Sequence, residues 1–296
     1  MLIAENLVKT YGRVTALDGF SLTVGKGEIV GLIGHNGAGK STFVHAVTGL
    51  ERADSGRIEV AGVDAVRHPR KARARIGVSP QETAFYPTVT VAAQLRLFGS
   101  LAGLSGFELR RQVASVAEEL DLGSVLERRA AQLSGGQQRR TQAACALIGH
   151  PDVLLLDEPT VGADPETRRA LLSAVRARAA AGAAVVYTTH YLPELVDLGA
   201  SLAIVHGGRI VRRGSQSALL NGLPSHLRVG FDGPVPAALA TSGELIDGQL
   251  DIVSLAPAQE LASLLARGHV PAVVDIQRPS LDDLFHAIVE EARDAA

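Results

Sequence analysis

The stretch GHNGAGKST at residues 34–42 constrains this chain more than any other feature. It fits the pattern G-x-x-x-x-G-K-[ST], and it follows an apolar run at 29–33 that is typical of a buried strand. Glycines in such a loop let backbone N–H groups converge on phosphate oxygens, and the start of the next helix adds a favourable dipole. The sequence therefore predicts a phosphate-binding loop between a strand and a helix.

The side chains of this loop indicate separate tasks. Lys40 is expected to reach the β- and γ-phosphates of a nucleotide, and the Ser41 hydroxyl is expected to ligate Mg²⁺. The other loop residues expected to contact the nucleotide are Gly34, His35, Asn36, Gly37, Ala38, Gly39 and Thr42.

A second motif, LLLDEP at residues 154–159, places two carboxylates at the end of an apolar strand. Phosphoryl transfer to water needs a positioned nucleophile and neutralised charge more than covalent help from the protein. Adjacent carboxylates can divide that work. We expect Asp157 to act through the magnesium ion and Glu158 to act as the base that positions the attacking water.

The segment LSGGQ at residues 133–137, here called the signature segment, opens a predicted helix ahead of Asp157. With the two motifs above, it makes the chain resemble the ATPase subunits of ABC transporters over about residues 1–215. The resemblance implies an α/β fold of the P-loop type, with a mixed β-sheet core and a helical insertion subdomain at about 88–147. It also implies ATP and Mg²⁺ as cofactors.

Further residues match this family in order along the chain. The resemblance implies that Tyr11 stacks on adenine, that Gln81 senses the γ-phosphate and touches the metal, and that His190 is a catalytic switch residue. Magnesium is then held by Ser41, Gln81 and Asp157. The signature residues expected to contact nucleotide held by an opposite subunit are Ser134, Gly135, Gly136 and Gln137.

A change in charge marks a boundary late in the chain. Residues 216–296 contain 4 of the 29 basic and 11 of the 31 acidic side chains, so residues 1–215 contain 25 and 20. Short strand and helix patterns continue beyond residue 215, including a helix at 257–266 and another that starts at Ser280. The sequence predicts a cassette at 1–215 and a small α+β accessory domain at 216–296.

Three phrases narrow the resemblance: FYPTVTV at 85–91, LDEPTVGADP at 156–165 and PSLDDLF at 279–285. They are similar to ATPases of the daunorubicin-resistance type, which export drugs and antibiotics with separately encoded permeases. The resemblance implies a permease partner, a second cassette in a homodimer, and export of a small amphiphile. We expect a cytoplasmic protein, peripheral on the inner face of the membrane, that touches the membrane only through its permease.

Composition and motifs weigh against other classes. With 46% hydrophobic and 20% charged residues, no apolar run of membrane-spanning length and no basic leader before an apolar run, we expect neither a span nor a secretory signal. The net charge of −2 offers no general attraction to nucleic acid. One alternative is an ABC ATPase acting on ribosomes or DNA without a permease, and a more distant one is a P-loop kinase, in which LSGGQ would have no task.

Overall fold

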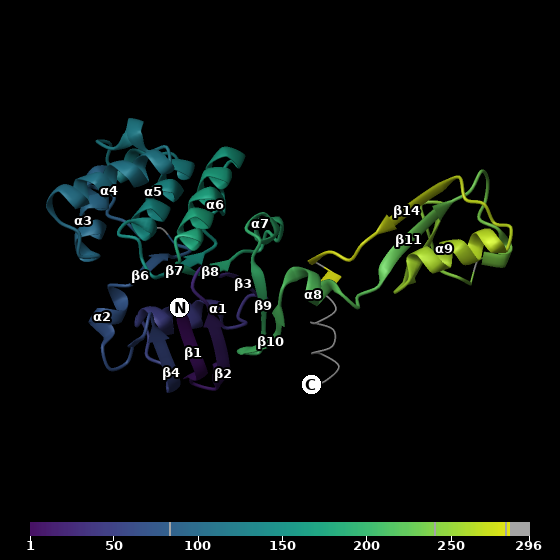
Figure 1. The fold of residues 1–296 in the computed structure, drawn as a ribbon, viewed down its shortest axis with the longest axis horizontal. Helices are drawn as coiled ribbons and strands as arrows, with labels where there is room; N and C mark the ends of the chain where they lie inside the picture. The colour runs from purple at the N-terminus through teal and green to yellow at the C-terminus, as the bar shows by residue number, and fades with distance from the viewer. Residues whose placement is uncertain (83, 240, 282, 285–296) are drawn as a thin grey trace. The chain divides into compact units, whose positions relative to one another are not determined.

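A six-stranded mixed sheet forms the centre of residues 1–215 in the computed structural model of this chain (Figure 1). The structure describes residues 1–82, 84–239, 241–281, 283 and 284. All neighbouring strands in this sheet are parallel except the edge pair of β10 and β9. From edge to edge, the strands are β10 (Arg209–Gly214), β9 (Ser201–His206), β3 (Ile29–Ile33), β8 (Ala184–Thr188), β7 (Val153–Asp157) and β6 (Ile76–Ser79).

The strands β3, β7 and β8 are buried along their whole length, as their uninterrupted apolar sequences predict. On one side, α1 (Lys40–Thr48) packs under the sheet, and its Phe43 stacks on Phe20 with ring centroids 4.7 Å apart. Figure 1 shows α5 (Gly135–Leu147) and α6 (Pro165–Ala180) on the opposite side. The predicted α/β fold class is therefore confirmed.

The first strands of the chain form a second, antiparallel sheet. Strand β1 (Leu2–Tyr11) pairs with both β2 (Val14–Val24) and β4 (Ser55–Val60), and β5 (Val63–Asp64) lies at the edge beside β4. In the sequence, short β-rich segments at 2–8, 20–24 and 57–60 predict strands, and each lies within one of these longer strands. Local patterns could not separate this sheet from the core sheet, because strand partners are chosen by tertiary contacts.

The residues with helical patterns between 88 and 147 form three α-helices. They are α3 (Val91–Leu101), α4 (Gly106–Glu119) and α5, with 3₁₀ turns η1 (Gly123–Val125) and η2 (Ala130–Gln132) between the last two. The Thr90 hydroxyl caps α3 by accepting a hydrogen bond from the Ala93 N–H at 3.2 Å. Helix α3 packs against both α4 and α5.

The short helices that were not predicted include α2 (Pro69–Arg73) and α7 (Pro193–Asp197). Each has five residues, which is too short to show a helical period, although each begins with the proline that favours a first helical turn. Within the described part of the chain, none of the helices combines the length and the hydropathy that a membrane crossing requires.

Residues 216–296 form a separate compact unit. It begins with α8 (Gln216–Leu220), contains the 3₁₀ turn η3 (Ala237–Leu239), and has an antiparallel sheet on which α9 (Pro257–Ala266) packs. The strand order is β12 (Glu244–Ile246), β13 (Gln249–Ser254), β11 (Ser225–Gly230) and β14 (Val273–Gln277).

The helix predicted from Ser280 begins with the expected capping pattern. The Ser280 N–H donates to the Asp283 carboxylate at 2.7 Å, and the Asp283 N–H donates to the Ser280 hydroxyl at 3.2 Å. Residue 282 and residues 285–296 of this predicted helix lie outside the described residues.

Candidate functional site

The predicted phosphate loop leaves β3 and enters α1, as the sequence requires. Gly34 has no room for a side chain, because a Cβ there would lie 2.6 Å from the Val205 carbonyl oxygen. Gly39 has a φ of 110°, and a Cβ there would press on the Ala16 carbonyl oxygen. Glycine is thus needed at both ends of the loop so that the backbone can turn around an open space.

Lys40 is the first residue of α1, and its side chain folds back over the loop. Its Nζ donates hydrogen bonds to the carbonyl oxygens of Gly34 at 2.5 Å and His35 at 3.1 Å. Burial lowers the pKa of Lys40 below its ordinary value, and the charges of Asp157 and Glu158 act in the opposite direction. The charges of both carboxylates of the second motif therefore act on this ammonium group, whose hydrogen bonds go to the two loop carbonyls.

Asp157 ends β7 and faces the start of α1. Its Oδ2 accepts a hydrogen bond from the Ser41 hydroxyl at 3.5 Å, and its Oδ1 accepts one from the Thr188 hydroxyl. A serine hydroxyl and a single carboxylate are hard oxygen ligands that suit Mg²⁺, which takes its remaining ligands from phosphates and water. Among the described residues, no cluster of three or more His, Cys, Asp or Glu side chains could hold a metal by itself.

Glu158 follows directly in a left-handed backbone conformation with a φ of 47°, which costs an ordinary residue on the order of 1–2 kcal/mol. Its N–H donates to both the carbonyl and the hydroxyl oxygen of Thr188, each at 3.1 Å, which stabilises this conformation. Its buried carboxylate accepts a hydrogen bond from Gln81 Nε2 at 3.0 Å and lies 2.6 Å from His190 Nε2. The structure therefore brings two predicted site residues, Gln81 and His190, into contact with the carboxylate of a third, Glu158.

The signature segment is not part of this cluster. The Ser134 hydroxyl accepts from the Gln137 N–H at 3.3 Å, and the Gln137 side chain accepts from the Ser134 N–H at 3.1 Å, which forms a capping box at the start of α5. A Cβ on Gly136 would lie 3.0 Å from Asp164 Oδ2. No hydrogen bond or ion pair between described residues joins this segment to the phosphate loop.

Tyr11 lies at the end of β1, with 43% of its surface exposed. The Lys9 ammonium group lies 5.4 Å from the centre of its ring. Its exposed ring has the planar shape that stacking on adenine requires.

Two residues that the sequence analysis did not identify hold Gln81 in place. Gln142 on α5 is buried, and its amide donates to the carbonyl oxygens of Pro80 and Glu82 on either side of Gln81. Arg139 donates to the Gln81 carbonyl oxygen at 2.8 Å. Gln142 is one of several polar residues in the first half of α5, so the sequence gives no signal that singles it out.

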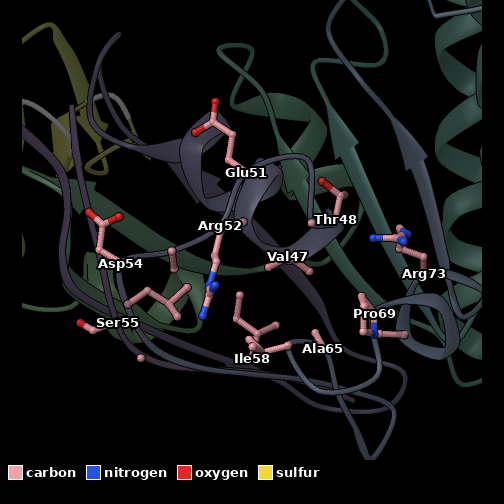
Figure 2. A pocket seen from close by; sticks show the side chains of 17 residues that line it. Val47, Thr48, Glu51, Arg52, Asp54, Ser55, Ile58, Ala65, Pro69 and Arg73 are labelled. Atoms are coloured by element: carbon pink, nitrogen blue, oxygen red, sulfur yellow. The ribbon is translucent and has the colours of Figure 1, made fainter. Parts of the chain in front are cut away.

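A separate cavity of about 390 Å³ lies at the other end of α1 (Figure 2). It extends from Thr48 at the end of this helix to Ile58 and Ala65, with the Arg52 side chain at one side. None of the predicted nucleotide-site residues lines it. The predicted site therefore lies at the carboxyl ends of the central strands β3, β7 and β8 and not in this cavity.

Known proteins resemble the chain over nearly its whole length. The family model described as ABC transporter matches residues 17–161. The daunorubicin resistance ATP-binding protein DrrA2 of Streptomyces coeruleorubidus is 36% identical, over 95% of this chain and 92% of that protein. The linearmycin resistance ATP-binding protein LnrL of Bacillus subtilis (strain 168) is 34% identical, over 96% of this chain and 97% of that protein.

The fold is also found in solved structures. A dimeric structure of the ATP-binding cassette MJ0796, in a post-hydrolysis state bound to ADP and Pi, matches with a TM-score of 0.66 and 25% identity. The match covers 73% of this chain and 98% of the MJ0796 chain. Together with the geometry around Glu158, these likenesses show that the chain belongs to the ATP-binding subunits of ABC transporters and is an ATPase.

Proposed function

We propose that this ATPase powers a separately encoded membrane permease that exports a drug, an antibiotic or another small amphiphile. The observation that carries the ATPase part of the proposal is the cluster of Gln81, Glu158 and His190. In this cluster Glu158 directly follows Asp157, the hydrogen-bond partner of Ser41 in the phosphate loop. The relatives named for daunorubicin and linearmycin resistance support the branch of the family. Under this proposal the protein is cytoplasmic and reaches the membrane through its permease.

In the proposed nucleotide site, Tyr11 stacks on adenine and the loop N–H groups bind the phosphates. Lys40 leaves its present carbonyl partners and donates to the β- and γ-phosphates. Ser41, Gln81 and Asp157 would hold Mg²⁺. When bound, this ion neutralises phosphate charge and so favours attack by water.

Glu158 is the proposed base. Its carboxylate accepts a proton from the attacking water, while Gln81 and His190 orient it from two sides. Burial and these two contacts limit the rotation of the carboxylate, so little reorganisation is required when the water arrives.

The proposed active unit contains two cassettes that face each other head to tail. The signature segment opens α5, so the N–H groups of Gly135 and Gly136 and the helix dipole can hold an anion that arrives from outside. Because no hydrogen bond or ion pair between described residues joins this segment to the loop of its own chain, we assign its ligand to the opposite cassette. An identical chain related by two-fold symmetry is the simplest source of that cassette.

An apolar groove supports a permease contact. The groove, of about 320 Å³, lies between the end of α1, strand β6 and helices α3 and α5. Leu50 and Leu101 on its rim are 73% and 68% exposed. Exposed apolar patches of this kind mark interaction surfaces, and a permease helix would cover this one.

The test is complementation in a mixed dimer. Lys40→Ala and Ser134→Arg subunits are each expected to be inactive alone. In the mixed dimer, one composite site contains both lesions and the other contains neither. We expect ATPase activity to recover partly on mixing. The control replaces the second subunit with a Lys40→Ala/Ser134→Arg double variant, which leaves no intact site. Light scattering on the Glu158→Gln protein in ATP measures dimer formation independently. The two-cassette mechanism would be refuted if ATPase activity does not recover on mixing and the Glu158→Gln protein stays monomeric.

A further inference from the structure

The carboxylate of Glu194 on α7 is fully buried and has a partner on every side. Its Oε1 accepts a hydrogen bond from the Thr160 hydroxyl at 2.6 Å and lies 3.1 Å from Arg168 Nε. Its Oε2 accepts hydrogen bonds from the Tyr187 hydroxyl at 2.9 Å and the Thr189 hydroxyl at 3.0 Å. A buried carboxylate with this many donors has one defined position.

Two of these donors belong to the segments that carry the reacting groups. Thr160 follows Glu158 by two residues, and Thr189 directly precedes His190. The side chains of Glu158 and His190 lie 2.6 Å apart. Glu194 therefore connects the two chain segments that carry these side chains, and its hydrogen-bond and ion-pair partners among the described residues include neither Glu158 nor His190.

The segment around His190 is held on both sides. The Thr189 hydroxyl, which donates to Glu194, also accepts from the Tyr191 N–H at 3.0 Å. Arg168, the ionic partner of Glu194, lies 4.7 Å from the centre of the Tyr191 ring. The backbone on either side of His190 is therefore anchored, directly or through one residue, to the same carboxylate.

Tyr187 offers an internal comparison. Its hydroxyl donates to the same Glu194 oxygen as Thr189 does, but its residue lies inside β8, where the strand ladder already holds the backbone. Burial and the nearby Glu194 charge raise the pKa of Tyr187, so its hydroxyl keeps its proton as a donor. Loss of this hydrogen bond would affect stability without freeing a loop.

We propose that Glu194 is a positioning residue for hydrolysis, which sets the distance between Glu158 and His190 by anchoring Thr160 and Thr189. The inference rests on the roles proposed above for Glu158 and His190. It assigns Glu194 an effect on the chemical step and none on nucleotide binding, because none of its described partners lies in the phosphate loop.

The experiment compares three substitutions that each remove one hydroxyl from this network: Thr160→Val, Thr189→Val and Tyr187→Phe. Each is expected to lower the thermal stability by a similar amount, that of one buried hydrogen bond. We expect the two threonine variants to lower kcat about tenfold with KM for ATP unchanged, because the Glu158–His190 geometry loosens. Tyr187→Phe, the matched control, is expected to keep kcat within about twofold of the wild type.

Two further variants test whether the effect passes through the carboxylate. Thr189→Ser keeps the hydroxyl and should restore kcat. Glu194→Gln keeps the size of the side chain but presents donors to other donors, so it should lower kcat as Thr189→Val does. The double variant Glu194→Gln/Thr189→Val should then be no worse than Glu194→Gln alone, because both changes remove the same interaction.

The inference is overturned if the threonine variants retain wild-type kcat, or if all three single variants lower kcat equally. Thr160→Val and Thr189→Val test the two anchored segments separately, so failure of one variant to fold leaves the other decisive. Glu158→Gln is measured in parallel. If Glu158→Gln hydrolyses ATP normally, the proposed role of Glu158 fails. If Glu158→Gln is inactive while both threonine variants keep full kcat, only the inference about Glu194 fails.

Discussion

His190 Nε2 lies 2.6 Å from Glu158 Oε1, and this contact joins the ends of two neighbouring strands. In the core sheet, Asp157 at the end of β7 pairs with Thr188 at the end of β8. Glu158 and His190 follow these two residues by one and two positions. The parallel register therefore places both side chains at the carboxyl ends of the strands, where the phosphate loop also begins.

Glu158→Gln should separate nucleotide binding from hydrolysis. The amide keeps the size of the side chain but cannot accept a proton, so we expect hydrolysis to fall by about a hundredfold or more, with ATP affinity retained. Single-turnover ATPase assays and calorimetric titration measure the two properties. Glu118→Gln on the exposed side of α4 is the matched control and should behave as the wild type. Normal hydrolysis by Glu158→Gln would contradict the assignment.

Lys40 should make ATP binding depend on pH. Burial lowers its pKa in the free protein, and bound phosphate raises the pKa again because it stabilises the ammonium group. At a pH between the pKa of Lys40 in the free protein and its pKa in the complex, Lys40 must take up a proton when ATP binds. The affinity for ATP therefore falls as the pH rises through this range. Titrations with Mg-ATP should show this decline beginning below the ordinary lysine pKa of about 10.4.

Two Lys40 variants provide the controls. Lys40→Ala should weaken nucleotide binding at every pH, because the ammonium group is absent. Lys40→Arg should remove the pH dependence, because a guanidinium group stays charged. A wild-type affinity that is constant over the same pH range would show that Lys40 does not meet the phosphates.

Ser134 should have two separable roles. As the N-cap of α5 it stabilises the helix, so Ser134→Ala is expected to cost about 1 kcal/mol of unfolding free energy. Ser134→Asp keeps a capping oxygen but adds a negative charge where a γ-phosphate is proposed to bind. We therefore expect Ser134→Asp to remain as stable as the wild type and to lose ATPase activity. Retained activity in Ser134→Asp would place the nucleotide elsewhere.

The two compact units divide after Ser215, so a truncated chain of residues 1–215 is expected to fold alone. This chain retains every predicted nucleotide-site residue. We expect it to bind Mg-ATP with the affinity of the full chain and to lose transport or assembly with the permease. Circular dichroism and nucleotide titration check the first part, and reconstitution with the permease checks the second. Loss of ATP binding on truncation would mean that residues 216–296 belong to the nucleotide-binding unit.

Much of the fold follows from local patterns. The buried strand at Ile29–Ile33 and the helix at Pro257–Ala266 have the predicted bounds. An apolar run and a helix-start residue each determine the backbone conformation of the few residues next to them, so both signals can be read from the local sequence. The sequence also indicates the hairpin of β9 and β10, in which two short strand-like segments at 201–205 and 209–213 flank the turn HGG. The separate N-terminal sheet was not predicted, because Leu2–Tyr11 could pair with any strand until tertiary contacts selected β2 and β4.

By itself, the sequence determined the phosphate loop and the chemical types of the residues around it, because glycine spacing and strand–loop–helix order are local properties. Only the tertiary structure decided that Gln81, 77 positions before Glu158, would donate to that carboxylate. It also decided that Glu194 would anchor the segments on both sides of the site. Such contacts depend on strand register and helix packing across the whole sheet, and no local pattern contains that information.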